Sequence, residues 1–79
     1  MTTLWLDKGP DGWRHKIDDD PVYCGNQIEV RINGEWVRGR YEAENLLPGA
    51  PRPVALLFVR AGAPPIRIEE FTEARFPTR

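Results

Sequence analysis

The feature that most constrains this chain is an Asn-Gly dipeptide between two runs in which apolar and polar residues alternate. The run Ile28–Ile32 precedes Asn33-Gly34, and a second alternating run follows over residues 35–42. Both residues of a two-residue hairpin turn adopt positive φ, which Asn and Gly tolerate best. The turn length then fixes how the strands pair, because a shift of one residue would turn every side chain to the opposite face. We therefore predict an antiparallel hairpin over residues 28–42.

The predicted register places Ile32 opposite Glu35, Arg31 opposite Trp36, Val30 opposite Val37 and Glu29 opposite Arg38. Residues opposite one another point to the same side of a sheet. One face of the hairpin is then apolar and carries Ile28, Val30, Ile32, Val37 and Tyr41. The other face carries Glu29, Arg31, Trp36, Arg38, Arg40 and Glu42.

Elsewhere, proline (8 residues) and glycine (7 residues) separate short apolar runs in a chain of 79 residues. Shorter strand candidates are residues 4–6, 13–17 and 66–68. The run Val54–Val59 is continuously apolar, as in a strand covered on both faces, although a short helix is the alternative. Residues 43–53 contain three prolines and form a stiff connection, and residues 69–72 fit one helical turn.

Five or six short strands, each with one apolar face, predict an all-β protein. We expect a small SH3-like barrel with a single helical turn before the last strand. Closing the sheet into a barrel would remove exposed strand edges, which otherwise invite aggregation. A chain of 79 residues has room for one domain, so residues 1–79 are expected to form a single small β-barrel domain.

Composition excludes several classes of protein. No apolar run approaches the roughly 18 residues of a membrane span, and the amino-terminal residues do not follow a signal-peptide pattern. We expect a soluble, cytoplasmic protein. The single cysteine allows no intramolecular disulfide. The 11 basic and 12 acidic residues leave a net charge of −1, which argues against a general electrostatic grip on nucleic acid or anionic membrane.

The middle of the chain combines Gly12-Trp13-Arg14, Cys24-Gly25, the hairpin with its Asn-Gly turn, Trp36 and the Arg40-Tyr41-Glu42 triplet. Over about residues 12–42 it resembles a small bacterial family of unknown function with these features at similar spacing. The family has no assigned activity. The resemblance implies a small all-β bacterial protein of a kind often carried on plasmids and other mobile genetic elements.

The polar face of the hairpin is the candidate interaction site, with Arg31, Trp36, Arg38 and Arg40 as its partner-binding residues. Arginine and tryptophan are favoured anchors in interfaces. Two simpler interpretations stay open: a solvated sheet face, or a face covered by the segment that contains Trp5. If the face binds a ligand, a partner protein is favoured, because nearby glutamates would repel phosphates. A small nucleic-acid-binding β-barrel that uses the same residues is the alternative.

The residues of the chain give little support to catalysis or metal binding. His15 and Cys24 are the only residues of their kinds, and a nucleophile pair also needs a third, orienting group. His15 stands between Arg14 and Lys16, whose charges would lower its pKa if they lie near it. The run Asp18–Asp20 lacks the ligand spacing of a calcium loop and fits a solvated turn before Pro21. We therefore expect a non-catalytic interaction module without cofactor or metal, and the sequence does not decide between monomer and dimer.

Overall fold

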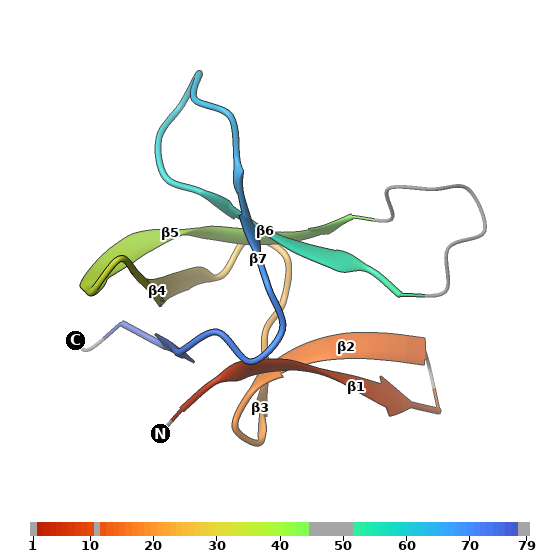
Figure 1. Cartoon of the computed structure of the whole chain (residues 1–79). Helices are drawn as coiled ribbons and strands as arrows, with labels where there is room; N and C mark the ends of the chain where they lie inside the picture. The colour runs from red at the N-terminus through yellow and green to blue at the C-terminus, as the bar shows by residue number, and fades with distance from the viewer. Residues whose placement is uncertain (1, 11, 45–51, 78–79) are drawn as a thin grey trace.

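The computed structural model describes residues 2–10, 12–44 and 52–77. These residues form eight antiparallel β-strands and no helix (Figure 1). The strands are β1 (Leu4–Gly9), β2 (Gly12–Ile17), β3 (Asp20–Pro21), β4 (Gln27–Ile32), β5 (Glu35–Glu44), β6 (Val54–Phe58), β7 (Ile66–Ile68) and β8 (Ala74–Arg75). Most of the predicted stiff connection, residues 45–51, lies outside the described residues.

The predicted hairpin is confirmed as β4 and β5, with the register expected from its turn. Arg31 lies opposite Trp36, and Glu29 lies opposite Arg38. The turn residues adopt left-handed backbone conformations, with φ of 51° at Asn33 and 82° at Gly34. These conformations match the right-handed twist of the two strands, so a two-residue turn can join them without splaying them apart.

The strands form two sheets. The smaller sheet has the order β1-β2-β3, and the larger has the order β7-β6-β5-β4-β8. The continuously apolar run becomes β6, an inner strand of the larger sheet, and its residues Ala55, Leu56 and Leu57 are all buried. The expectation of a strand covered on both faces is therefore confirmed for β6, whereas Val59, the last residue of the predicted run, lies outside the strand and is 44% exposed.

The segment before β8 joins the two sheets. Glu73 forms a bridge with Thr3, the amide of Leu4 donates to the Thr72 carbonyl at 2.9 Å, and the amide of Ala74 donates to the Thr2 carbonyl at 3.0 Å. Figure 1 shows this segment passing between the smaller sheet and the end of β4. The all-β class is confirmed and the arrangement is barrel-like, but the described strands do not close into a complete cylinder.

The turn before the last strand differs from the prediction. The amide of Thr72 donates to the Glu69 carbonyl at 3.2 Å, as a short turn requires, but Phe71 has a φ of 69°. A right-handed helical turn needs negative φ at every residue, so the segment is a reverse turn with one left-handed residue. The number of strands also exceeds the predicted five or six, because β3 and β8 contain only two residues each and leave no periodic pattern.

One apolar cluster fills the space between the two sheets. The larger sheet provides most of its members, the smaller sheet adds two, and the connecting segments add Val22; the cluster comprises Leu4, Ile17, Val22, Ile28, Val30, Tyr41, Ala55, Leu57, Ile68 and Ala74. Because residues on the core face of β4 and β5 are fixed by the hairpin register, the opposite face of these strands is turned away from the core.

Gly39 allows β5 to approach β6 closely. A Cβ atom at this position would lie 2.8 Å from Leu57 Cγ and 2.8 Å from the Phe58 carbonyl oxygen. Such distances are well inside van der Waals contact, and one of the two atoms belongs to the backbone. Gly39 is therefore a packing requirement of the sheet.

We predict that Gly39→Ala destabilises the fold by about 1–3 kcal/mol, the usual cost of overpacking a core. Urea unfolding would measure the change in the free energy of unfolding. Gly9→Ala is the matched control, because a Cβ there would meet only the Gly12 carbonyl oxygen at 3.8 Å. Equal stability of the two variants would contradict the close approach of β5 and β6.

Candidate interaction surface

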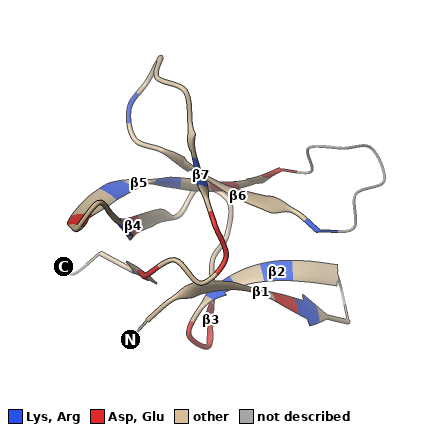
Figure 2. Cartoon of the chain, viewed as in Figure 1, with Lys and Arg blue, Asp and Glu red and all other residues tan. Residues whose placement is uncertain are grey.

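The face of β4 and β5 that points away from the core carries all four predicted site residues. We call it the Arg/Trp face and define it by Glu29, Arg31, Trp36, Arg38, Arg40 and Glu42, together with Phe58 of β6 and Arg75 of β8. Register places the last two residues there, because Phe58 lies opposite Arg40 and Arg75 lies opposite Glu29. Figure 2 shows basic residues in the middle of β5 and acidic residues towards its two ends, with further acidic residues at the turn beside β3.

Glu29 is the centre of this face. Its carboxylate accepts a hydrogen bond from Arg75 Nε at 2.7 Å and pairs with Arg38 Nη2 at 3.3 Å. The Glu29 side chain is only 14% exposed, whereas those of Arg38 and Arg75 are 56% and 44% exposed. The hydrogen bond from Arg75 is the main reason that the pKa of Glu29 lies below its usual value, and the charges of both arginines add to it. One shielded carboxylate thus orients two exposed guanidinium groups.

The ring of Trp36 lies close to two arginines. The guanidinium carbon of Arg75 is 3.9 Å from the ring centroid, and that of Arg31 is 5.4 Å away. Both distances suit a cation–π interaction, which is worth about 0.5–1 kcal/mol at an exposed site. The indole remains partly exposed. The alternative that the Trp5 segment covers this face is not what the structure shows, because Trp5 lies in β1, where its Nε1 donates to the Asp18 carbonyl at 2.6 Å.

Arg40 lies on the same face but has separate contacts. Its Nε pairs with Glu42 at 3.0 Å, and its guanidinium carbon lies 5.0 Å from the centroid of the Phe58 ring. The structure therefore brings Arg31, Trp36 and Arg38 into one cluster around Glu29 and leaves Arg40 in a second cluster. Sequence reasoning missed Arg75 and Phe58, because their positions depend on pairing between distant strands.

His15 and Cys24 both line a hollow of about 230 Å³ between β2 and β5, with Tyr41 beside them. His15 is buried, and its Nδ1 is hydrogen-bonded to the Tyr41 hydroxyl. Burial lowers the pKa of His15, and the nearby charge of Glu70 acts against this shift. The direction agrees with the expectation from the sequence, but the neighbouring basic residues are not its cause. Burial likewise raises the pKa of the Tyr41 hydroxyl.

The acidic run Asp18–Asp20 forms a turn. Asp18 has a φ of 55° and begins the reversal between β2 and β3, and all three aspartates are exposed. In the described ranges, no group of three or more His, Cys, Asp or Glu residues is arranged to hold a metal ion. The same ranges contain no helix that is long and apolar enough to cross a bilayer.

Comparison with known proteins assigns the chain to no family. No protein-family model matches the chain, and no curated protein or solved structure matches it significantly. The resemblance over residues 12–42 to a bacterial family therefore stays a prediction, as do a bacterial origin and a link to mobile genetic elements.

The contacts of Glu29 predict unequal effects of its two partners on its titration. Arg75→Gln should raise the pKa of Glu29 more than Arg38→Gln does, because the hydrogen bond from Arg75 is the largest cause of the lowered pKa. Side-chain carboxyl chemical shifts, followed by NMR against pH, would give the midpoints. Arg60→Gln, on an exposed loop, is the control that should leave the midpoint unchanged. Equal shifts in the three variants would contradict the network.

The buried His15 predicts a loss of stability in mild acid. Its folded pKa lies below the unfolded value of 6.5, so below that pH the unfolded chain binds a proton that the folded protein does not. Stability should therefore be full above pH 6.5 and fall as the pH drops from there through the lowered folded pKa. Thermal melts between pH 5 and 8 would show this loss in the wild type and a smaller one in His15→Gln, which lacks the titrating ring. The same slope in both proteins would contradict the assignment.

Proposed function

We propose that this protein is a non-catalytic interaction module that docks on a partner protein through the Arg/Trp face. The observation that carries the proposal is the arrangement around Glu29, which holds Arg38 and Arg75, while Arg75 and Arg31 both lie close to the ring of a partly exposed Trp36.

Preorganised arginines favour binding at the Arg/Trp face. A free arginine loses considerable rotamer entropy when a partner immobilises it, and this loss lowers the affinity. Arg38 and Arg75 are already held by a carboxylate, yet roughly half of each side chain is open to solvent, at 56% and 44%. Their remaining N–H groups can therefore bind carboxylates or carbonyls of a partner at a reduced entropic cost, while Trp36 offers an apolar anchor.

A protein fits the charge pattern of this face better than a nucleic acid does. Glu29 and Glu42 stand among the arginines and neutralise part of their charge. A nucleic acid presents a uniformly negative backbone, which these carboxylates repel, whereas a protein surface can offer both signs of charge. Arg31 is the arginine of this face for which the described residues show no carboxylate partner, and it provides the best support for the nucleic-acid alternative.

The only histidine, His15, supports a non-catalytic role. The Nδ1 of His15 is occupied by the Tyr41 hydroxyl, and the residue is 6% exposed, so the ring is poorly placed to exchange protons with a substrate. We also propose a cytoplasmic location, which suits an exposed free thiol such as that of Cys24.

Replacement of Trp36 tests the proposed surface. In affinity capture from the native cell, Trp36→Ala should lose at least about 90% of the captured partner, since anchor residues contribute about 2 kcal/mol or more to binding. Trp5→Ala is the matched control, because Trp5 is also partly buried beside a cation, Lys16, but belongs to the smaller sheet.

Two further measurements make this test decisive. Melting temperatures of both variants must show that the loss of binding does not follow from unfolding; a strongly destabilised Trp36→Ala with unaltered binding would contradict the proposal. Electrophoretic shifts with single- and double-stranded oligonucleotides at low salt should show no complex. A complex whose affinity falls steeply with salt and disappears in Trp36→Ala would establish the nucleic-acid alternative instead.

A further inference from the structure

The larger sheet ends at β7, whose outer edge has no strand partner within the described residues. Ile66, in this edge strand, is 38% exposed. Beside the edge lies an open hollow of about 280 Å³, lined by the end of β4, by β7 and by Glu69 and Thr72. An unpaired edge presents backbone N–H and C=O groups to any strand that can align with them.

We propose that β7 pairs antiparallel with β7 of a second copy of this chain, about a two-fold axis, so that two copies share one continuous sheet. This inference goes beyond the proposed function, which concerns a different surface. Two-fold contacts place the same patch on both subunits, so the edge must be complementary to itself. The sequence of this edge meets that condition.

Only one register of the pairing is favourable. Residues that lie opposite each other must point to the same face of the sheet, so the two-fold axis passes through a residue position. An axis at Ile66 would place Pro64 and Pro65 in the ladder, where they have no N–H to donate. An axis at Arg67 would place two guanidinium groups opposite each other, which is repulsive. An axis at Ile68 places Arg67 opposite Glu69 of the second copy.

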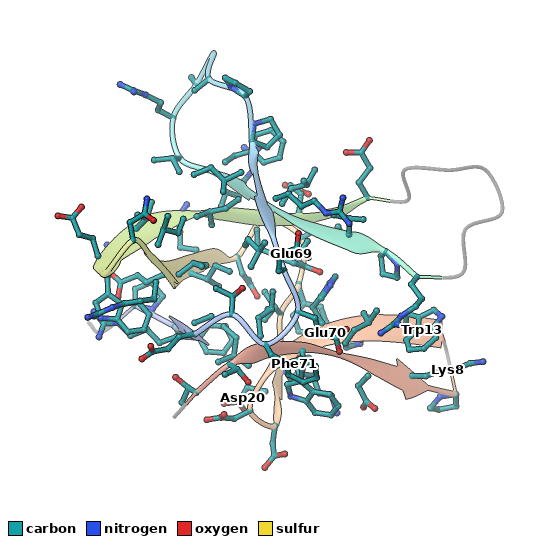
Figure 3. All side chains as sticks on the ribbon, in the orientation of Figure 1. Lys8, Trp13, Asp20, Glu69, Glu70 and Phe71 are labelled. Carbon is teal, nitrogen blue, oxygen red and sulfur yellow. The ribbon has the colours of Figure 1, made fainter. Side chains whose placement is uncertain are left out.

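The side chains of this register are available for pairing. Arg67 and Glu69 are 58% and 78% exposed, and the contact between them within one chain is a loose one of 3.8 Å. Figure 3 shows Glu69 directly after β7, on the segment that descends toward the smaller sheet. Across the two-fold axis, Arg67 of each copy faces Glu69 of the other, so the two symmetry-related pairs form a cluster of four side chains with alternating charge. The same residues that would repel in one register therefore attract in this one.

The ladder is short, and the association is correspondingly weak. The prolines limit it on one side, and on the other side the Glu69 carbonyl already accepts hydrogen bonds from the amide and hydroxyl of Thr72. So short a strand pairing is typical of transient assemblies, so the fraction of dimer should rise with protein concentration. Because the axis is perpendicular to the sheet, the two Arg/Trp faces would lie on the same side of the dimer.

Charge reversal across the axis tests the pairing. Sedimentation velocity over a concentration series should show a reversible dimer of the wild type. Arg67→Glu and Glu69→Arg should each weaken association by about tenfold, because each places like charges opposite each other in both pairs. An equimolar mixture of the two variants should regain the wild-type affinity to within about threefold, since both cross-axis pairs are then opposite in sign.

Matched controls separate the edge contact from the effect of net charge. Arg60→Glu and Glu44→Arg make the same charge changes at exposed positions away from the β7 edge. Each should associate as the wild type does, and their mixture should associate no more strongly. A wild type that is monomeric at all accessible concentrations would overturn the proposal. So would a mixture of the two β7 variants that associates no better than either alone.

Discussion

The register of the β4–β5 hairpin is the constraint on which the rest of the structure depends. Left-handed backbone at Asn33 and Gly34 permits a two-residue turn, and a turn of that length allows one alignment of the strands. Ile28 and Val30 then face the core, while Glu29 comes opposite Arg38. A slip by one residue would expose the apolar side chains and bury the charges, at a cost that a domain with so small a core could not offset.

Glu29 holds two arginines of the Arg/Trp face in place. A carboxylate surrounded by solvent would bind either arginine weakly, because exposed ion pairs contribute about 0–1 kcal/mol. Here the side chain that holds the two arginines is only 14% exposed, and one of them, Arg75, also lies over the Trp36 ring. The same contacts therefore stabilise the fold locally and shape the surface that we propose as an interface.

The two sheets depend on contacts between segments that are distant in the chain. Backbone hydrogen bonds between residues 2–4 and 71–74 join the sheets at one end, and the hydrogen bond between His15 and Tyr41 joins them inside. The second contact satisfies two polar groups that would otherwise be costly to bury. It also ties the stability of the fold to the protonation of one imidazole. The short strand β7 at the other end of the larger sheet has no strand partner on its outer edge among the described residues.

The residue pattern alone predicts the all-β class, the hairpin with its register, a buried strand within Val54–Val59 and the side of the sheet on which Arg31, Trp36, Arg38 and Arg40 lie. Each of these follows from local rules: turn chemistry at Asn33-Gly34, and the period of two that separates the faces of a strand. Three features emerge only in the folded chain: Arg75 reaches Glu29 and Trp36, Tyr41 binds His15, and the turn before β8 is left-handed at Phe71. These features join residues that are far apart in the chain, or depend on a backbone conformation that the residue type disfavours. Their free energy comes from packing and hydrogen bonds between elements, and no local pattern of residues records it.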